Sequence, residues 1–246
     1  MRTAIQEASA MTAGTLSTLG ASIAPRKFVD AYRTAKIIIA NRVRHVDVPS
    51  EPHFDEEGTA YFCNQLESAR NYLEYGSGGS TILANKLVNT LVSVDSDASL
   101  LADVRRKLAE EGGRKAMTKL IHVNIGLTHD WGMPVFTKPT RRRVRRWEDY
   151  PTAPWRYFRS IAQQPDLILV GGRFRVACVL ESLLSLSPLS NTQILLDDYA
   201  ERPHYQVVER FADLEMAGRM AVLRPRRLID RIQVRRMVRQ FCADPR

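Results

Sequence analysis

Short apolar runs alternate with helical stretches over most of the chain, from Asn71 to Leu223. The runs have the length of strands and lie at 72–75, 91–94, 120–123, 167–170 and 194–196. Helical spacing fills the gaps at about 80–88, 99–111 and 174–186. This alternation predicts a parallel sheet covered on both faces, because each crossover helix packs back onto the sheet.

The segments on either side of this alternation have other patterns. Helical spacing is found at 26–44 and again at 57–68, before the first strand. After the fifth strand the sequence predicts a helix at 203–211, a strand pair at 216–223 and a basic helix at 227–241. The basic helix is amphipathic, so we expect it to pack on the domain or a partner, with contact to an anionic membrane surface as a second interpretation.

One segment breaks the alternation between the third and fourth strands. It runs from Trp131 to Pro154 and contains the basic run Arg141 to Arg146. Long irregular connections are commonly functional or disordered, so we expect a long surface insertion here. The chain then divides into a flexible extension at 1–26, a helical segment at 27–70 that packs on the core, an α/β core at 71–225 and the C-terminal helix at 226–246.

Charge and cysteine usage narrow the class of protein. The formal net charge of +9 favours phosphate-rich or acidic partners without naming one. No apolar run approaches the roughly 18 residues of a membrane-spanning helix, so we expect no transmembrane segment. The three cysteines lie far apart without a C-x-x-C pair, which argues against a disulfide framework or a zinc site. These features are typical of a cytoplasmic protein.

A glycine-rich turn stands where the first strand of the core runs into its first helix. The sequence there is Glu74-Tyr75-Gly76-Ser77-Gly78-Gly79-Ser80-Thr81. Glycines let the backbone turn tightly and approach a ligand, and the amides at the helix start face that ligand. Asp95 ends the second strand about 20 residues later, where nucleotide-binding folds place a ribose-binding carboxylate. A dinucleotide site would have glycine in place of Thr81, so the turn favours S-adenosylmethionine over NAD.

The pattern Glu74-x-Gly76-x-Gly78-Gly79 resembles motif I of the class I S-adenosylmethionine-dependent methyltransferases. The segments 72–81, 126–132, 172–178 and 197–199 resemble, more narrowly, a small bacterial subgroup of methyltransferase-like proteins of unknown function. The resemblance covers roughly residues 71–223. It implies a Rossmann-like class I methyltransferase fold, with a mostly parallel seven-stranded sheet, helices on both faces and the cofactor at the carboxyl ends of the strands.

The resemblance also implies which residues bind S-adenosylmethionine. The glycine turn would line its methionine part, Asp95 would hold the ribose hydroxyls, and Asn124 with Ile125 would meet the adenine. An acidic residue is expected at the position of Asn124. The full set is Glu74, Gly76, Ser77, Gly78, Gly79, Asp95, Asn124 and Ile125.

A methyl acceptor needs alignment with the donor and, when it is a hydroxyl, a base that removes its proton. The fifth strand ends in Asp197-Asp198-Tyr199, and His204 follows shortly after. Two carboxylates alone do not complete an oxygen-rich cation site, so we expect no metal. His204 is then the expected base because the histidine pKa lies near neutrality. The alternative is structural: Asp197 caps a helix, Tyr199 packs and His204 lies at the surface.

The fourth strand ends in Gly171-Gly172-Arg173, where the resembling subgroup would have aspartate in place of Gly171. That difference puts catalysis in question. Arg173 and Arg175 either bind an anionic group of the acceptor or form internal ion pairs with Asp198 and Glu181. The residues expected at the acceptor are Asp198, His204, Tyr199 and Arg173.

The basic run at 141–146 is flanked by aromatic residues, a composition typical of nucleic-acid-binding loops. The aromatic residues are Trp147, Tyr150, Trp155 and Tyr157. A solvated loop over the mouth of the active site is the alternative interpretation. The sequence also lacks the Asn-Pro-Pro-Tyr and Asp-Pro-Pro-Tyr motifs of methyltransferases that modify amino groups of DNA and RNA.

The sequence thus favours an S-adenosylmethionine-dependent enzyme that methylates a hydroxyl of a small molecule or saccharide. One alternative is a non-catalytic module that keeps the cofactor pocket and binds an anionic partner. Another is an RNA methyltransferase. The oligomeric state stays open.

Overall fold

A computed structural model of the protein describes residues 45–112 and 116–246. The predicted extension at 1–26 and helix at 26–44 lie outside the described residues. The predicted core strands and helices are confirmed, with ends that shift by at most three residues. The elements in chain order are α3 (Glu56–Ser68), β1 (Asn71–Tyr75), α4 (Gly79–Leu87), β2 (Thr90–Asp95), α5 (Ala98–Glu111), β3 (Met117–His122), η1 (Asp130–Gly132), α6 (Arg141–Trp147), α7 (Asp149–Ser160), β4 (Leu167–Val170), α8 (Arg175–Ser185), β5 (Gln193–Leu196), η2 (Pro203–Arg210), β6 (Ala212–Ala217), β7 (Met220–Pro225) and α9 (Arg231–Phe241).

The strands form one mixed seven-stranded sheet in the order β3-β2-β1-β4-β5-β7-β6. The four pairs from β3 to β5 are parallel, and the two pairs that include β7 are antiparallel. The expectation of a mostly parallel sheet therefore holds for β1 to β5. The β6–β7 hairpin adds antiparallel pairs at one edge, so the sheet as a whole is mixed. Tyr75 pairs with Val94 on one side and Val170 on the other. The segments that follow β1, β2 and β4 consequently meet at one edge of the sheet.

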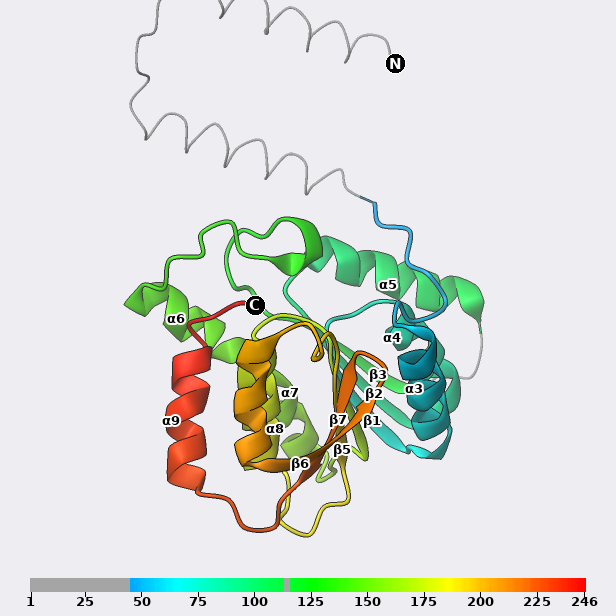
Figure 1. The fold of residues 1–246 in the computed structure, drawn as a ribbon. Helices are drawn as coiled ribbons and strands as arrows, with labels where there is room; N and C mark the ends of the chain where they lie inside the picture. The colour runs from blue at the N-terminus through cyan, green and yellow to red at the C-terminus, as the bar shows by residue number, and fades with distance from the viewer. Residues whose placement is uncertain (1–44, 113–115) are drawn as a thin grey trace, which may run out of the picture. The chain divides into compact units, whose positions relative to one another are not determined.

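The central strands β1, β2, β4 and β5 are buried along nearly their whole length. Successive residues of a strand point to opposite faces, so both faces of this part of the sheet are covered. Leu73, Val92 and Ile168 belong to a large core that also takes in side chains of α7, α8 and α9. Tyr72 and Leu91 belong to a second core with residues of α3 and α4. Figure 1 shows α3, α4 and α5 on one side of the sheet and α7, α8 and α9 on the other.

The prediction of a surface insertion at 131–154 is wrong. The segment forms the end of η1, all of α6 and half of α7. Trp147, Tyr150 and Trp155 are at most 2% exposed and lie in the large core. The amphipathic pattern of this segment is hard to recognise in the sequence, because arginines stand between the apolar residues that pack both helices on the core. The aromatic residues are therefore not free to stack on nucleic-acid bases, apart from Tyr157, which is half-buried beside Lys119.

The C-terminal half of the prediction needs smaller corrections. The predicted helix at 203–211 is the 3₁₀ helix η2, and the predicted strand pair is the β6–β7 hairpin. The basic helix begins at Arg231, not at residue 227, because Asp230 caps it through the amides of Ile232 and Gln233. Leu228 is 94% exposed and precedes the helix. Among the described residues, no helix combines the length and apolar character needed to cross a membrane.

Candidate functional site

The glycine turn joins β1 to α4, and each glycine has its own constraint. Gly76 has φ +97°, and a Cβ there would lie 2.7 Å from the backbone nitrogen of Gly172. A Cβ on Gly79 would lie 1.8 Å from the carbonyl oxygen of Glu51. A Cβ on Gly78 would meet nothing within 4 Å. Gly78 is thus the open member of the turn, while Gly76 and Gly79 allow other chain segments to pass close by.

Glu74 is fully buried, and its side chain hydrogen-bonds to residues of the glycine turn. Its carboxylate accepts hydrogen bonds from Tyr72 Oη at 3.0 Å, from Ser80 Oγ at 2.7 Å and from Thr81 Oγ1. Thr81 Oγ1 in turn accepts the amide hydrogen of Gly78 at 2.9 Å. Burial raises the pKa of Glu74, although these hydroxyl donors oppose the rise. Glu74, the acidic residue of the motif, therefore stabilises the conformation of the glycine turn.

Asp95 lies at the end of β2 against the same turn. Its Oδ2 accepts the amide of Ser77 at 2.9 Å and its Oδ1 accepts the amide of Asp97 at 2.8 Å. A carboxylate has about four acceptor sites, so each oxygen keeps capacity for a hydroxyl donor. Burial raises the pKa of Asp95 to about 6. A diol that donates to Asp95 would favour its charged form.

The two residues expected at the adenine lie after β3. Asn124 is exposed, and its side chain accepts the amide of Gly126 at 3.0 Å. Ile125 is buried in the core, and its carbonyl accepts from Trp147 Nε1 at 2.9 Å. Asn124 therefore shapes the loop locally, and Ile125 anchors that loop to α6.

The loop around Gly132 reaches back to the end of β2. The carbonyl of Gly132 accepts from Ser96 Oγ at 3.1 Å. A Cβ on Gly132 would lie 3.6 Å from Asp95 Oδ1 and 4.0 Å from Cγ of Arg173. The ends of β2 and β4 and the loop after β3 therefore converge at one place beside Asp95.

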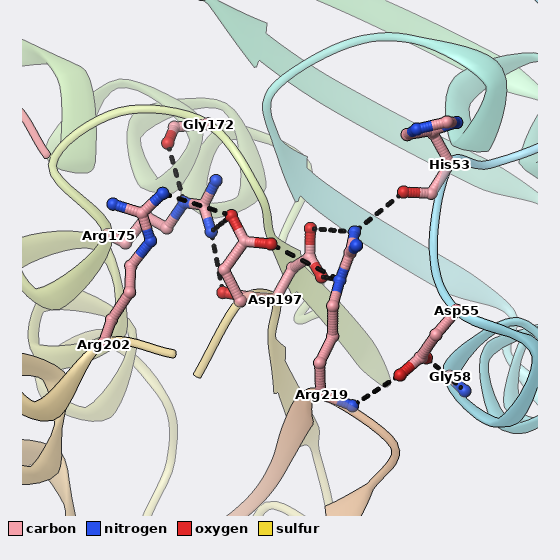
Figure 2. A network of polar contacts seen from close by, with 9 residues as sticks. His53, Asp55, Gly58, Gly172, Arg175, Asp197, Arg202 and Arg219 are labelled. Carbon is pink, nitrogen blue, oxygen red and sulfur yellow. Dashed lines mark hydrogen bonds and ion pairs between the residues drawn. The ribbon is translucent and has the colours of Figure 1, made fainter. Parts of the chain in front are cut away.

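The carboxylates after β5 are engaged by arginines. Asp198 lies 2.8 Å from Arg175 Nη1, 3.4 Å from Arg219 Nε and 3.6 Å from Arg202 Nη2. Asp197 accepts from Arg219 Nε at 3.0 Å. Figure 2 shows Arg175 and Arg202 on one side of Asp197 and Arg219 on the other. Burial favours a higher pKa for Asp198, but the arginines outweigh it and hold the pKa below its usual value.

Arg219 extends this network to the segment before α3. Its Nη2 donates to the carbonyl of His53 at 2.9 Å, and its amide donates to Asp55 Oδ2 at 2.7 Å (Figure 2). Asp55 also caps α3 through the amide of Gly58. The network therefore ties the loop after β5 to the β6–β7 turn and to α3.

Tyr199 and His204 differ in their surroundings. Tyr199 donates its hydroxyl to Glu209, and burial together with Glu209 raises its pKa. His204 packs its ring 4.5 Å from that of Tyr205, and its Nε2 is buried without a hydrogen-bond partner among the described residues. Burial and the charge of Arg246 lower the pKa of His204, so its ring is neutral at neutral pH.

Arg173 and Arg175 have divergent environments. Arg175 is the ion-pair partner of Asp198 and also donates to the carbonyls of Gly172 and Asp197. The side chain of Arg173 makes no ion pair with any described residue, and its buried Nε lacks a hydrogen-bond partner there. The internal-pairing interpretation thus fits Arg175 with Asp198, whereas Arg173 has no carboxylate partner within residues 45–112 and 116–246.

Several residues of the site carry no signal in the sequence. Tyr150 comes from α7, yet its hydroxyl donates to the carbonyl of Val94 and lies 3.5 Å from the amide of Arg173. Tyr205 is fully buried, and its hydroxyl has no hydrogen-bond partner in the described part of the chain. Arg219 closes the carboxylate network from the β6–β7 turn. Only burial of the aromatic run around Tyr150 could have been anticipated, from its helical spacing.

The residues present fit S-adenosylmethionine in their chemistry. Asp95 has free acceptor capacity for a diol, and Gly78 leaves the turn open toward a ligand. Within residues 45–112 and 116–246, no group of three or more His, Cys, Asp or Glu side chains is arranged to hold a metal ion.

Sheet order, glycine turn and strand-end acid together define a class I methyltransferase-type protein. No protein-family model matches the chain, and no curated protein matches it in sequence. A solved methyltransferase-like protein from Silicibacter pomeroyi is 32% identical, with a TM-score of 0.67; the match covers 79% of this chain and 98% of that one. The chain belongs to the family of that protein, among the class I S-adenosylmethionine-dependent methyltransferases, and the family implies S-adenosylmethionine as cofactor.

A methyltransferase from Geobacter sulfurreducens is also similar in structure. It is 14% identical, with a TM-score of 0.43, and the match covers 89% of this chain and 96% of that one.

Proposed function

We propose that this protein transfers a methyl group from S-adenosylmethionine to a hydroxyl of a small molecule or saccharide. The observation that carries the cofactor half of the proposal is the contact of Asp95 Oδ2 with the amide of Ser77, at 2.9 Å. It brings the ribose-binding candidate against the open glycine, Gly78, at the carboxyl edge of the sheet. When bound, S-adenosylmethionine supplies a methyl group activated by its sulfonium.

The acceptor half of the proposal rests on His204. Its ring is neutral at neutral pH and its buried Nε2 has no partner among the described residues, so it can accept the proton of a hydroxyl. Asp198 is a weaker base because three arginines hold its pKa down. In this scheme Asp198 fixes Arg175, Tyr199 packs against Glu209, and Arg173 binds the acceptor.

Calorimetric titration with S-adenosylmethionine and S-adenosylhomocysteine tests the cofactor half. We expect micromolar binding by the wild type and its loss in both Gly78→Arg and Asp95→Ala. Absence of binding by the folded wild type would sink the proposal. With binding established, methyl transfer to a panel of hydroxyl compounds tests the second half, and His204→Asn should lower kcat while leaving cofactor affinity unchanged.

One observation favours the alternative of a non-catalytic binding module. A Cβ on Gly171 would have only Tyr75 O within 4 Å, at 3.9 Å, so lack of space for a Cβ does not require glycine here. The chain nevertheless lacks the carboxylate that the resemblance places at this position. Tight cofactor binding without methyl transfer to any hydroxyl, thiol or amine would identify this alternative.

A further inference from the structure

Buried polar atoms without a hydrogen-bond partner gather at one place in the described part of the chain. They are Arg173 Nε, His204 Nε2 and Tyr205 Oη, together with Glu111 Oε2 elsewhere. Glu111 Oε2 is compensated, because it lies 2.5 Å from Lys86 Nζ. Leaving a buried polar atom unpaired costs about 1–3 kcal/mol, so three such atoms together call for an explanation.

Arg173 follows β4, while His204 and Tyr205 lie in η2, which follows β5. The rings of His204 and Tyr205 are 4.5 Å apart, edge to face. Arg175, Arg202 and Arg173 all lie close enough to Tyr205 to oppose the rise that burial causes in its pKa. Cγ of Arg173 lies 4.0 Å from the Cβ position of Gly132, which is also 3.6 Å from Asp95 Oδ1. The cluster therefore adjoins the proposed cofactor site.

The arginines around Tyr205 outnumber the carboxylates that pair with them. Asp198 pairs with both Arg175 and Arg202, at 2.8 Å and 3.6 Å, so one carboxylate faces two guanidinium groups. Arg173 has no such carboxylate among the described residues, and its pKa is lowered by burial and by the charge of Arg175. A guanidinium in these surroundings attracts an anion, and its planar array of N–H donors suits a carboxylate or phosphate.

We infer that Arg173 and Tyr205 form a subsite for an anionic group, carboxylate or phosphate, of the methyl acceptor. The inference rests on the proposed function and deepens it by specifying the acceptor class. Arg173 supplies the charge and Tyr205 donates its otherwise unpaired hydroxyl. His204 Nε2, beside Tyr205, then faces a hydroxyl of the same molecule. The acceptor is a hydroxylated carboxylate or phosphate, and a neutral saccharide would leave Arg173 unpaired.

Titration of inorganic phosphate and of acetate into the full chain tests the subsite, at constant ionic strength, with and without saturating S-adenosylhomocysteine. Arg173→Gln should weaken anion binding at least about tenfold, and Tyr205→Phe about fivefold, the usual effect of one hydrogen bond. Arg145→Gln is the matched control, since it removes one exposed charge from α6 and should change nothing. Circular dichroism verifies that each variant folds.

Three outcomes would overturn the inference. Two of them are equal binding of both anions by wild type and Arg173→Gln, and no anion binding by the wild type. The third is that Arg173→Gln weakens S-adenosylhomocysteine but not 5′-methylthioadenosine, which lacks the carboxylate; the anion would then be the cofactor's own. Anion binding that depends on Arg173 in a protein that binds no S-adenosylhomocysteine would instead refute the proposed function and leave the subsite standing.

Discussion

The carboxylate of Asp198 lies 2.8 Å from Nη1 of Arg175, whose side chain is only 6% exposed. This pair fixes the start of α8 against the loop after β5, because Arg175 also donates to the carbonyls of Gly172 and Asp197. The segments after β4 and β5 are thereby held in one arrangement. A carboxylate that the sequence places at the acceptor thus has a structural role in the fold.

The Asp198–Arg175 pair predicts a large loss of stability for Asp198→Asn. Removing one member of a buried ion pair leaves the other charge uncompensated, which costs about 3 kcal/mol or more. Asp213→Asn is the control, because Arg226 and Asp213 form an exposed pair, with side chains 44% and 72% exposed. That change should cost less than about 1 kcal/mol. Chemical denaturation measures both, and equal losses would contradict the structural role.

The same pair predicts acid sensitivity. The pKa of Asp198 is lower in the folded protein than in the unfolded chain. Its ionised form therefore stabilises the fold above the unfolded pKa, and this contribution disappears as the pH falls through the folded pKa. Unfolding curves measured at falling pH should show a smaller acid loss in Asp198→Asn than in the wild type. Parallel curves would show that other carboxylates govern acid unfolding.

Replacement by alanine should have opposite effects on stability and cofactor binding at the adjacent residues Gly78 and Gly79. Gly79→Ala places a Cβ 1.8 Å from the carbonyl of Glu51, so the segment before α3 must move and the protein should lose several degrees in Tm. Gly78→Ala meets nothing within 4 Å and should leave Tm unchanged. Its methyl group points into the open side of the turn, so cofactor affinity should fall. Thermal melts and calorimetry separate the two effects.

Asp95 predicts a pH-dependent affinity for the cofactor. Its pKa is about 6 in the ligand-free protein, and the ribose hydroxyls donate best to the ionised form. Affinity for S-adenosylhomocysteine should therefore be constant well above pH 6 and fall toward about tenfold per unit below it. Asp95→Asn should bind weakly at every pH. A wild-type affinity that stays flat across this range would exclude Asp95 as the ribose ligand.

The exposed arginines of α6 test the RNA methyltransferase alternative. Arg141, Arg142, Arg145 and Arg146 are exposed and have no ion-pair partner among the described residues. Replacing all four with glutamine should change the free energy of unfolding by little, within about 0.5 kcal/mol per site. If RNA is the acceptor, the salt dependence of RNA binding should weaken, by a slope of about 0.9 for each duplex phosphate that the arginines no longer neutralise. Unchanged RNA binding would exclude α6 as the RNA-binding surface.

The sequence predicted most of the core and part of the site. Apolar runs located β1, β2, β4 and β5 closely, because buried strands in a parallel sheet are apolar on both faces. The glycine turn and Asp95 were recognisable from their spacing along β1 and β2. The helices α6 and α7 were missed because their apolar positions are interrupted by arginines and prolines. For the carboxylates after β5, the sequence offered Arg175 as a partner of Asp198 but left the choice open, since the partners Arg175 and Arg219 come from different elements.

The sequence alone determined the order of the core strands and of the helices between them apart from α6 and α7, together with the glycine turn and the position of Asp95, because these depend on local spacing and backbone freedom. Tertiary structure decided which charged groups pair. Asp198 meets Arg175 from α8 and Arg219 from the β6–β7 turn, while Arg173 meets no carboxylate among the described residues. Charge pairing depends on distances between elements remote in sequence, and burial then sets each pKa. For this reason we propose Arg173 and His204, rather than Asp198, as the groups that meet an acceptor.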